Sequence, residues 1–208
     1  MKNKIKNLLF DLGGVIMDIK RENCVAAFEA MGMSGANELL GEYSQKGAFL
    51  ELEEGRITPA EFRAEIRRHI SGIVDDCDID AAFCKFLLGI PPHRLNALDE
   101  LRKKYKIYLL SNTNPIMIES DIKRHFRVCG KEMADYFDGM VLSYKAKAIK
   151  PDPAIFEYAI KHLCIEPGET VFFDDSRKNL DASEAFGFKT ALVEPGMEFM
   201  DIIMEKLY

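Results

Sequence analysis

The fold of this chain is decided by the stretch Leu8-Leu9-Phe10-Asp11-Leu12-Gly13-Gly14-Val15. An apolar run from Ile5 to Phe10 is stopped by the acid Asp11, which is the pattern of a short buried strand that ends in a polar loop. The Gly13-Gly14 pair lets the backbone turn tightly after that acid. The stretch therefore predicts a strand that delivers Asp11 into a tight loop.

Similar apolar runs recur along the chain, and helical patterns lie between them. Further strands are predicted at Ile107–Ser111, Val171–Asp174 and Thr190–Val193, with a weaker one at Met140–Ser143. Asp152-Pro153 supplies an N-cap and a first-turn proline for one helix, and Gly187 is a typical stop for another that begins near Arg177. Strands that alternate with helices predict an α/β fold, with a mostly parallel sheet covered on both faces.

The segment from about Lys20 to Pro91 breaks this alternation, because it carries helical patterns and no convincing strand. Thr58-Pro59-Ala60-Glu61 is a capping box with proline at the first helical position, and it opens a helix through about Ile70. We therefore expect an α/β core formed by residues 1–17 and 93–208, with residues 18–92 as an all-helical insertion.

The composition limits the partners of the protein. Among 208 residues, 48% are hydrophobic and 30% are charged, which is ordinary for a globular chain with a real core. A net charge of -6 without a long basic run disfavours nucleic acid as a partner. Five scattered cysteines without C-x-x-C spacing are typical of reduced thiols, and the apolar N-terminal stretch is too short to span a bilayer. We expect a cytoplasmic protein without a membrane partner.

Polar residues stand at the carboxyl ends of the predicted strands, where open parallel sheets bind their ligands. Asp11 follows the first strand, Ser111-Asn112 ends the second, and Asp174-Asp175 ends the strand that begins at Val171. Lys150 precedes the helix that starts at Pro153. These side chains are predicted to converge on one crevice.

Three acids in one crevice need compensating positive charge. Repulsion among the three negative charges of Asp11, Asp174 and Asp175 is unfavourable without compensation. A divalent cation plus Lys150 would supply three positive charges. Hard oxygen ligands suit Mg²⁺, which also binds substrate phosphate. Lys150 and the Ser111 hydroxyl would then hold phosphoryl oxygens while Asp11 attacks phosphorus and forms an aspartyl-phosphate.

Four motifs in order along nearly the whole chain carry a family resemblance. They are Leu8–Ile16, Leu110-Ser111-Asn112, Lys150-Pro151-Asp152 and Phe172-Phe173-Asp174-Asp175. The set resembles the haloacid dehalogenase-like hydrolase superfamily, and within it the group of bacterial α-D-glucose-1-phosphate phosphatases and the N-terminal phosphatase domain of soluble epoxide hydrolases. The resemblance implies a Rossmann-like core with a helical cap inserted after the first motif. It also implies Mg²⁺-dependent hydrolysis of a small phosphorylated metabolite, such as a sugar phosphate.

The same resemblance assigns roles in catalysis and phosphate binding to individual residues. Asp11 is implied to be the nucleophile, and Ser111 and Asn112 are implied to bind the phosphoryl group. Lys150 is implied to neutralise both the nucleophile and the phosphate.

The implied metal ligands are the carboxylates of Asp11 and Asp175 and the backbone carbonyl of Gly13. Asp174 has two open roles: it contacts the metal through water, or it holds Lys150 in place. Asn179 is either an orienting residue for a metal ligand or a plain helix position.

Gly13 departs from the family pattern, in which a second aspartate two residues after the nucleophile is the general acid and base. Such a group is commonly worth about 10² to 10⁴ in rate. Three accounts remain open: a substrate with a good leaving group, a water molecule, or a side chain from the cap. In the cap, Arg21 and the turn Glu54-Gly55-Arg56 resemble places that reach toward substrate.

The residues are also compatible with two other functions. One is a binding or regulatory protein that keeps the fold and has lost turnover. The other is a metal-free haloacid dehalogenase, a class that also lacks the second aspartate, although the retained Asp174-Asp175 pair argues for a metal.

Overall fold

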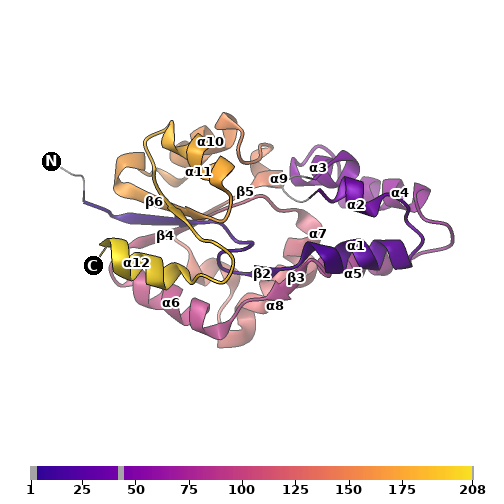
Figure 1. The fold of residues 1–208 in the computed structure, drawn as a ribbon, viewed down its shortest axis with the longest axis horizontal. Helices are drawn as coiled ribbons and strands as arrows, with labels where there is room; N and C mark the ends of the chain where they lie inside the picture. Colours follow the sequence, from indigo (N-terminus) through magenta and orange to yellow (C-terminus); the bar gives the residue numbers. More distant parts are fainter. Residues whose placement is uncertain (1–3, 42–44, 208) are drawn as a thin grey trace.

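A computed structural model describes residues 4–41 and 45–207 of the chain, and its centre is a five-stranded parallel sheet (Figure 1). The strands are β1 (Asn7–Phe10), β4 (Lys106–Ser111), β5 (Gly139–Leu142), β6 (Thr170–Asp174) and β7 (Lys189–Leu192). Their order in the sheet is β5-β4-β1-β6-β7, and every neighbouring pair is parallel. All the strands predicted for the sheet, including the weaker one, are confirmed with small shifts at their ends.

Helices cover both faces of this sheet. The helices after residue 90 are α6 (Pro92–Arg102), α7 (Pro115–Met117), α8 (Lys123–Phe126), α9 (Ser143–Ala146), α10 (Pro153–Leu163), α11 (Arg177–Glu184) and α12 (Phe199–Leu207). Figure 1 shows α10 and α11 on one side of the sheet and α6 and α12 on the other. Leu8 and Phe10 of β1 belong to the hydrophobic cluster that contains Leu98 and Ile203, whereas Leu9 packs in the cluster of α10 and α11, because strand side chains alternate between faces. The predicted α/β fold is confirmed.

Shorter helical turns complete this part. A π-helical turn spans Ile118–Ile122, and 3₁₀ turns span Arg127–Cys129, Met133–Tyr136 and Pro167–Glu169. Within residues 4–41 and 45–207, none of the helices combines the length and the apolar character needed to cross a membrane.

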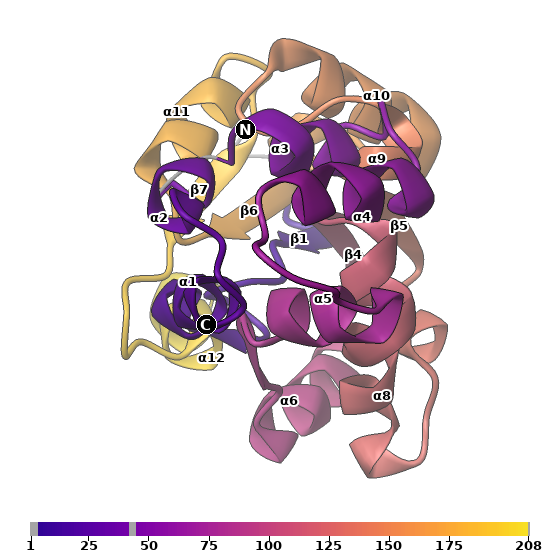
Figure 2. The ribbon, with the colours of Figure 1, turned by 90° about the vertical axis from the view of Figure 1, so that its right-hand side faces the viewer.

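Residues 21–84 form a second group of helices, called here the helical region. Its helices are α1 (Arg21–Ala30), α2 (Ala36–Leu39), α3 (Gly47–Glu53), α4 (Pro59–Arg68) and α5 (Asp76–Cys84). They pack around four phenylalanines from four different helices, Phe28, Phe49, Phe62 and Phe83, which are fully buried with contacting ring centroids 5.1 to 6.3 Å apart. The predicted capping box of Thr58 and Glu61 starts α4. Figures 1 and 2 place the helical region beyond the carboxyl ends of the sheet strands.

Two short strands connect the helical region to the sheet. β2 (Asp18–Ile19) pairs antiparallel with β3 (Leu87–Gly89), so the chain leaves and returns side by side. The prediction of an all-helical insertion over residues 18–92 is therefore wrong at its two ends, where β2 and β3 lie. Strands of two and three residues are too short to display an alternating pattern, which explains the difference.

Candidate active site

Three adjacent strands bring the predicted site residues together. Asp11 directly follows β1, and its backbone N–H still donates to the Phe173 carbonyl of β6 at 2.8 Å, so the nucleophile candidate is fixed by the sheet itself. Ser111 and Asp174 are the last residues of β4 and β6. We call the residues at the ends of β1, β4 and β6, together with Lys150, the sheet edge.

A cavity of about 340 Å³ lies between the sheet edge and the helical region. The sequence-predicted residues that line it are Asp11, Gly13, Ser111, Asn112, Lys150, Asp175 and Asn179. Asp174 does not line the cavity and is fully buried behind it. The predicted convergence on one crevice is therefore observed for all of these residues except Asp174.

Lys150 is buried between two carboxylates. Its Nζ lies 2.9 Å from Oδ1 of Asp11 and 2.7 Å from Oδ2 of Asp174, and its side chain is 1% exposed. Burial lowers the pKa of Lys150, but the charges and hydrogen bonds of Asp11 and Asp174 outweigh burial and raise it above its ordinary value. The lysine is therefore a fixed positive charge beside Asp11.

Asp174 uses both of its carboxylate oxygens within the protein. Oδ2 accepts from Lys150 Nζ, and Oδ1 accepts from the Ser176 backbone N–H at 2.8 Å and from the Asn179 amide at 2.9 Å. Of the two roles open for Asp174, these contacts match the second, in which it holds Lys150. Asn179 in turn orients Asp174.

The carboxylates of the sheet edge fit a divalent cation. Oxygen atoms of Asp11, Asp174 and Asp175 all lie within 4.8 Å of one another, and among the described residues Lys150 is the only opposing charge at hydrogen-bond distance. Burial raises the pKa of Asp11 to about 7; Lys150 opposes this, while Asp174 and Asp175 add to it. Burial and the charge of Asp174 likewise raise the pKa of Asp175. A hard cation between Asp11 and Asp175 would relieve this repulsion.

Gly14 allows Asp175 to approach the loop after β1. Its φ of +73° favours glycine, and a Cβ at this position would lie 2.3 Å from Oδ2 of Asp175. Any side chain at residue 14 would therefore displace the carboxylate that stands next to Asp11.

The Asn112 side chain is occupied by the backbone of Lys150. Its amide donates to the Lys150 carbonyl at 2.9 Å, and its oxygen accepts from the Lys150 N–H at 2.8 Å. Phosphate binding by Asn112 stays a prediction, because the main chain of Lys150 already occupies the amide oxygen and one of the two amide N–H groups. Ser111 is 2% exposed and lines the cavity, as phosphate binding requires.

Sequence reasoning missed five polar residues that line the cavity: Gln45, Glu53, Thr113, Ser176 and Lys178. Ser176 and Lys178 follow Asp175 closely, so their place after a strand end was a usable signal. Gln45 and Glu53 come from the helical region, and only the packing of that region reveals them.

The two features of the helical region that sequence analysis did single out lie elsewhere. Arg21 donates to the backbone carbonyls of Leu40 and Asn37, and it lines a different surface hollow. Arg56 pairs with Glu54 at 2.5 Å. None of Arg21, Glu54, Gly55 and Arg56 lines the cavity.

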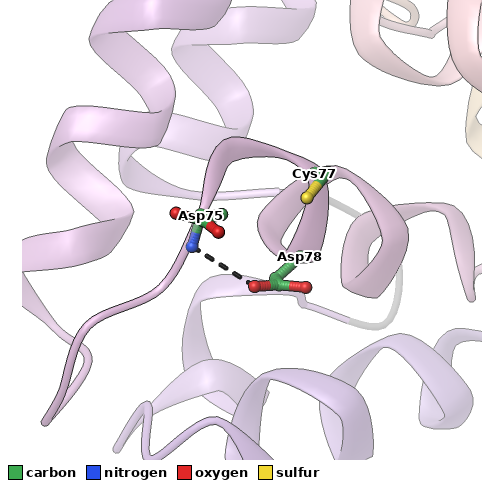
Figure 3. Close-up of side chains that lie close together, drawn as sticks. All are labelled: Asp75, Cys77 and Asp78. Atoms are coloured by element: carbon green, nitrogen blue, oxygen red, sulfur yellow. Dashed lines mark hydrogen bonds between the residues drawn. The ribbon is translucent and has the colours of Figure 1, made fainter.

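A second group of possible metal ligands, Asp75, Cys77 and Asp78, lies at the start of α5 (Figure 3). All three side chains are exposed, and the Asp75 backbone N–H donates to the Asp78 carboxylate at 3.3 Å. A capping box accounts for this proximity, because its side chains gather around the first turn of a helix.

Comparison with known proteins agrees with this geometry. Residues 5–187 match the family of haloacid dehalogenase-like hydrolases. Over 195 residues the chain is 37% identical to D-ribitol-5-phosphate phosphatase from Bacteroides thetaiotaomicron, which covers 94% of this chain and 95% of that protein. A segment of 81 residues, 39% of this chain and 15% of the relative, is 32% identical to bifunctional epoxide hydrolase 2 of Rattus norvegicus.

A solved structure extends this likeness to three dimensions. A haloacid dehalogenase family enzyme from Bacteroides thetaiotaomicron, in complex with magnesium and inorganic phosphate, superposes with a TM-score of 0.89. The two chains are 40% identical, and the match covers 95% of this chain and 98% of the other. The chain belongs to the haloacid dehalogenase-like hydrolase family.

Proposed function

We propose that this protein is a Mg²⁺-dependent phosphatase that removes the phosphoryl group of a small phosphorylated metabolite through Asp11. The observation that carries the proposal is the buried ion pair of Lys150 with Asp11 and Asp174, in which Lys150 and Asp11 line the cavity. Family membership and the relative named as a phosphatase support it.

Asp11 is the nucleophile in this proposal. Lys150 and the Leu12 backbone N–H both contact Oδ1, at 2.9 and 2.7 Å, so Oδ2 is the oxygen with capacity left to attack phosphorus. The Asp11–phosphorus bond forms as the bond to the leaving oxygen breaks, and water then hydrolyses the aspartyl-phosphate. Lys150 and the Ser111 hydroxyl stabilise charge on the phosphoryl oxygens.

Asp11, Asp175 and the backbone carbonyl of Gly13 would hold the cation in this proposal. Mg²⁺ bound there supplies positive charge beside the phosphoryl oxygens and offsets the repulsion among the acids. The magnesium and phosphate complex of the similar enzyme supports this choice of cation.

Residues 18–92, which contain the helical region and the two short strands, are proposed to act as a cap over the sheet edge. Gln45 and Glu53 reach the cavity from this region, and polar groups at that end suit a hydroxylated substrate such as a sugar or polyol phosphate. The name of the D-ribitol-5-phosphate phosphatase points to the same class. A cytoplasmic location is proposed on the five cysteines, all of which are free.

Release of inorganic phosphate tests the proposal. The purified chain is assayed with p-nitrophenyl phosphate, acetyl phosphate and D-ribitol 5-phosphate, each with Mg²⁺ and with EDTA. We expect Mg²⁺-dependent release that falls by about 10³-fold or more in Asp11→Asn. Asp201→Asn, an exposed change in α12, is the matched control and should retain activity.

Three results would count against this function. They are full activity in Asp11→Asn, no phosphate release from any phosphoester or acyl phosphate, and metal-independent chloride release from 2-chloropropionate. The second result would favour a binding or regulatory protein, and the third would favour a dehalogenase.

A further inference from the structure

Glu53 is a carboxyl group of the helical region that lines the cavity together with residues of the sheet edge. It is the last residue of α3 and lines the same cavity as Asp11 and Gly13. Within residues 4–41 and 45–207, its side chain makes no hydrogen bond or ion pair with another residue. An acid that lines a cavity without an internal partner is available to whatever the cavity holds.

The residues before and after Glu53 in the chain are firmly packed and fix its position. Phe49 and Leu52 anchor α3 with fully buried side chains, and Glu54 is paired with Arg56. Gly55 has a φ of +64°, and a Cβ added there would lie 2.1 Å from the carbonyl oxygen of Tyr144 in α9. The turn after α3 therefore packs directly against the backbone of α9, which follows β5. The helical region therefore presents Glu53 to the cavity from a firmly packed turn.

The position of Glu53 in the cavity favours the protonated form of its carboxyl group. Burial raises the pKa of Glu53 to about 8, and the negative charges of Asp11 and Glu54 add to the effect. A protonated carboxylic acid can donate a proton to a leaving oxygen, and a pKa near the working pH also lets it take a proton back.

We propose that Glu53 is the general acid and base of this enzyme, in place of the carboxylate that is absent at Gly13. The inference rests on the proposed phosphatase function with Asp11 as nucleophile. It assigns the missing proton transfer to the helical region and not to the loop after β1.

In the first step, Asp11 Oδ2 bonds to phosphorus, the bond from phosphorus to the leaving oxygen breaks, and Glu53 gives its proton to that oxygen, so an alcohol leaves. In the second step, water attacks phosphorus, Glu53 takes a proton from the water, and the bond to Asp11 breaks. The sum is one phosphoester and one water converted to one alcohol and one inorganic phosphate, with both carboxyl groups restored.

A series of aryl phosphates tests this role, from p-nitrophenyl phosphate to unsubstituted phenyl phosphate. A general acid matters most for the poorest leaving group. We therefore expect Glu53→Gln to lower kcat/KM for phenyl phosphate by about 10² to 10⁴, and for p-nitrophenyl phosphate far less. Glu53→Ala should give the same steeper dependence on the leaving group. Glu51→Gln, on the same helix and outside the cavity lining, should keep the wild-type dependence.

Rapid mixing with p-nitrophenyl phosphate isolates the second step. Because the base for water is lost, Glu53→Gln should show a burst of p-nitrophenol followed by slow turnover. If Glu53→Gln lowers kcat/KM equally for all the aryl phosphates, or not at all, and Asp11→Asn still abolishes activity, the assignment of Glu53 is overturned and the proposed function stands. If Asp11→Asn is as active as the wild type, the proposed function itself fails.

Discussion

The sheet edge and the helical region line the same cavity in different ways. At the sheet edge, three side chains are held by partners within the protein: Lys150 by two carboxylates, Asp174 by three donors, and Asn112 by the main chain. From the helical region, the Glu53 carboxyl and Gln45 Oε1 have no hydrogen-bond partner among the described residues. Groups that are already satisfied hold geometry, whereas unsatisfied groups are set to meet a ligand.

The largest effect is expected from breaking the sheet edge at Lys150. Lys150→Met keeps the length of the side chain but leaves Asp11 and Asp174 as buried acids without a cation. We expect a loss of stability of about 3 to 5 kcal/mol, since one partner of a buried ion pair is removed. Phosphatase activity should fall by about 10²-fold or more.

Urea unfolding and steady-state kinetics measure both losses. Lys178→Met removes an exposed lysine that lines the same cavity and has no buried carboxylate partner in the part of the chain that the structure describes, so it should keep near-normal stability. Equal stabilities for the two variants would show that the Lys150 pair does not organise the sheet edge.

A smaller effect is expected on the pH dependence of stability without metal. A carboxyl group whose pKa is higher in the folded protein keeps a proton that the unfolded chain has released, so stability falls as pH rises. For Asp11 the fall spans pH 3.8 to about 7, and for Glu53 it spans pH 4.5 to about 8. Mg²⁺ binds the folded protein and favours ionised Asp11. It should therefore restore the stability that is lost through Asp11 as pH rises.

Thermal melts from pH 5 to pH 8, in EDTA and in Mg²⁺, separate the two regions. The gain in Tm on adding Mg²⁺ should grow with pH in the wild type. In EDTA, the Tm of Glu53→Gln should fall less with rising pH than the Tm of the wild type, because the contribution of the Glu53 carboxyl group is removed. A gain from Mg²⁺ that is constant over this range would contradict the coupling of the cation to Asp11.

The smallest effect is expected at Gln45. Its buried Oε1 lines the cavity, and we expect it to accept a hydrogen bond from a substrate hydroxyl. Gln45→Ala should raise KM for D-ribitol 5-phosphate by about tenfold, which is the value of one hydrogen bond. KM for acetyl phosphate, which has no hydroxyl, should stay unchanged. A similar rise for both substrates would place Gln45 outside substrate recognition.

Sequence predicted the sheet edge well because its signals are local. Each strand is a short apolar run, and the site residues Asp11, Ser111 and Asp174 stand where such a run stops. What was missed depends on tertiary packing. β3 is too short to carry a pattern, the tie of Asn112 to Lys150 spans 38 residues, and Glu53 reaches the cavity only through the packing of α3.

Trapping the covalent intermediate tests the role of Asp11 most directly. The protein is mixed with ³²P-labelled acetyl phosphate and Mg²⁺, quenched in acid within milliseconds, and digested. We predict that the label is found on the peptide that contains Asp11, that it disappears on longer incubation without fresh substrate, and that it is absent in Asp11→Asn. Label on another residue, or undiminished label in Asp11→Asn, would contradict the assignment of Asp11 as the nucleophile.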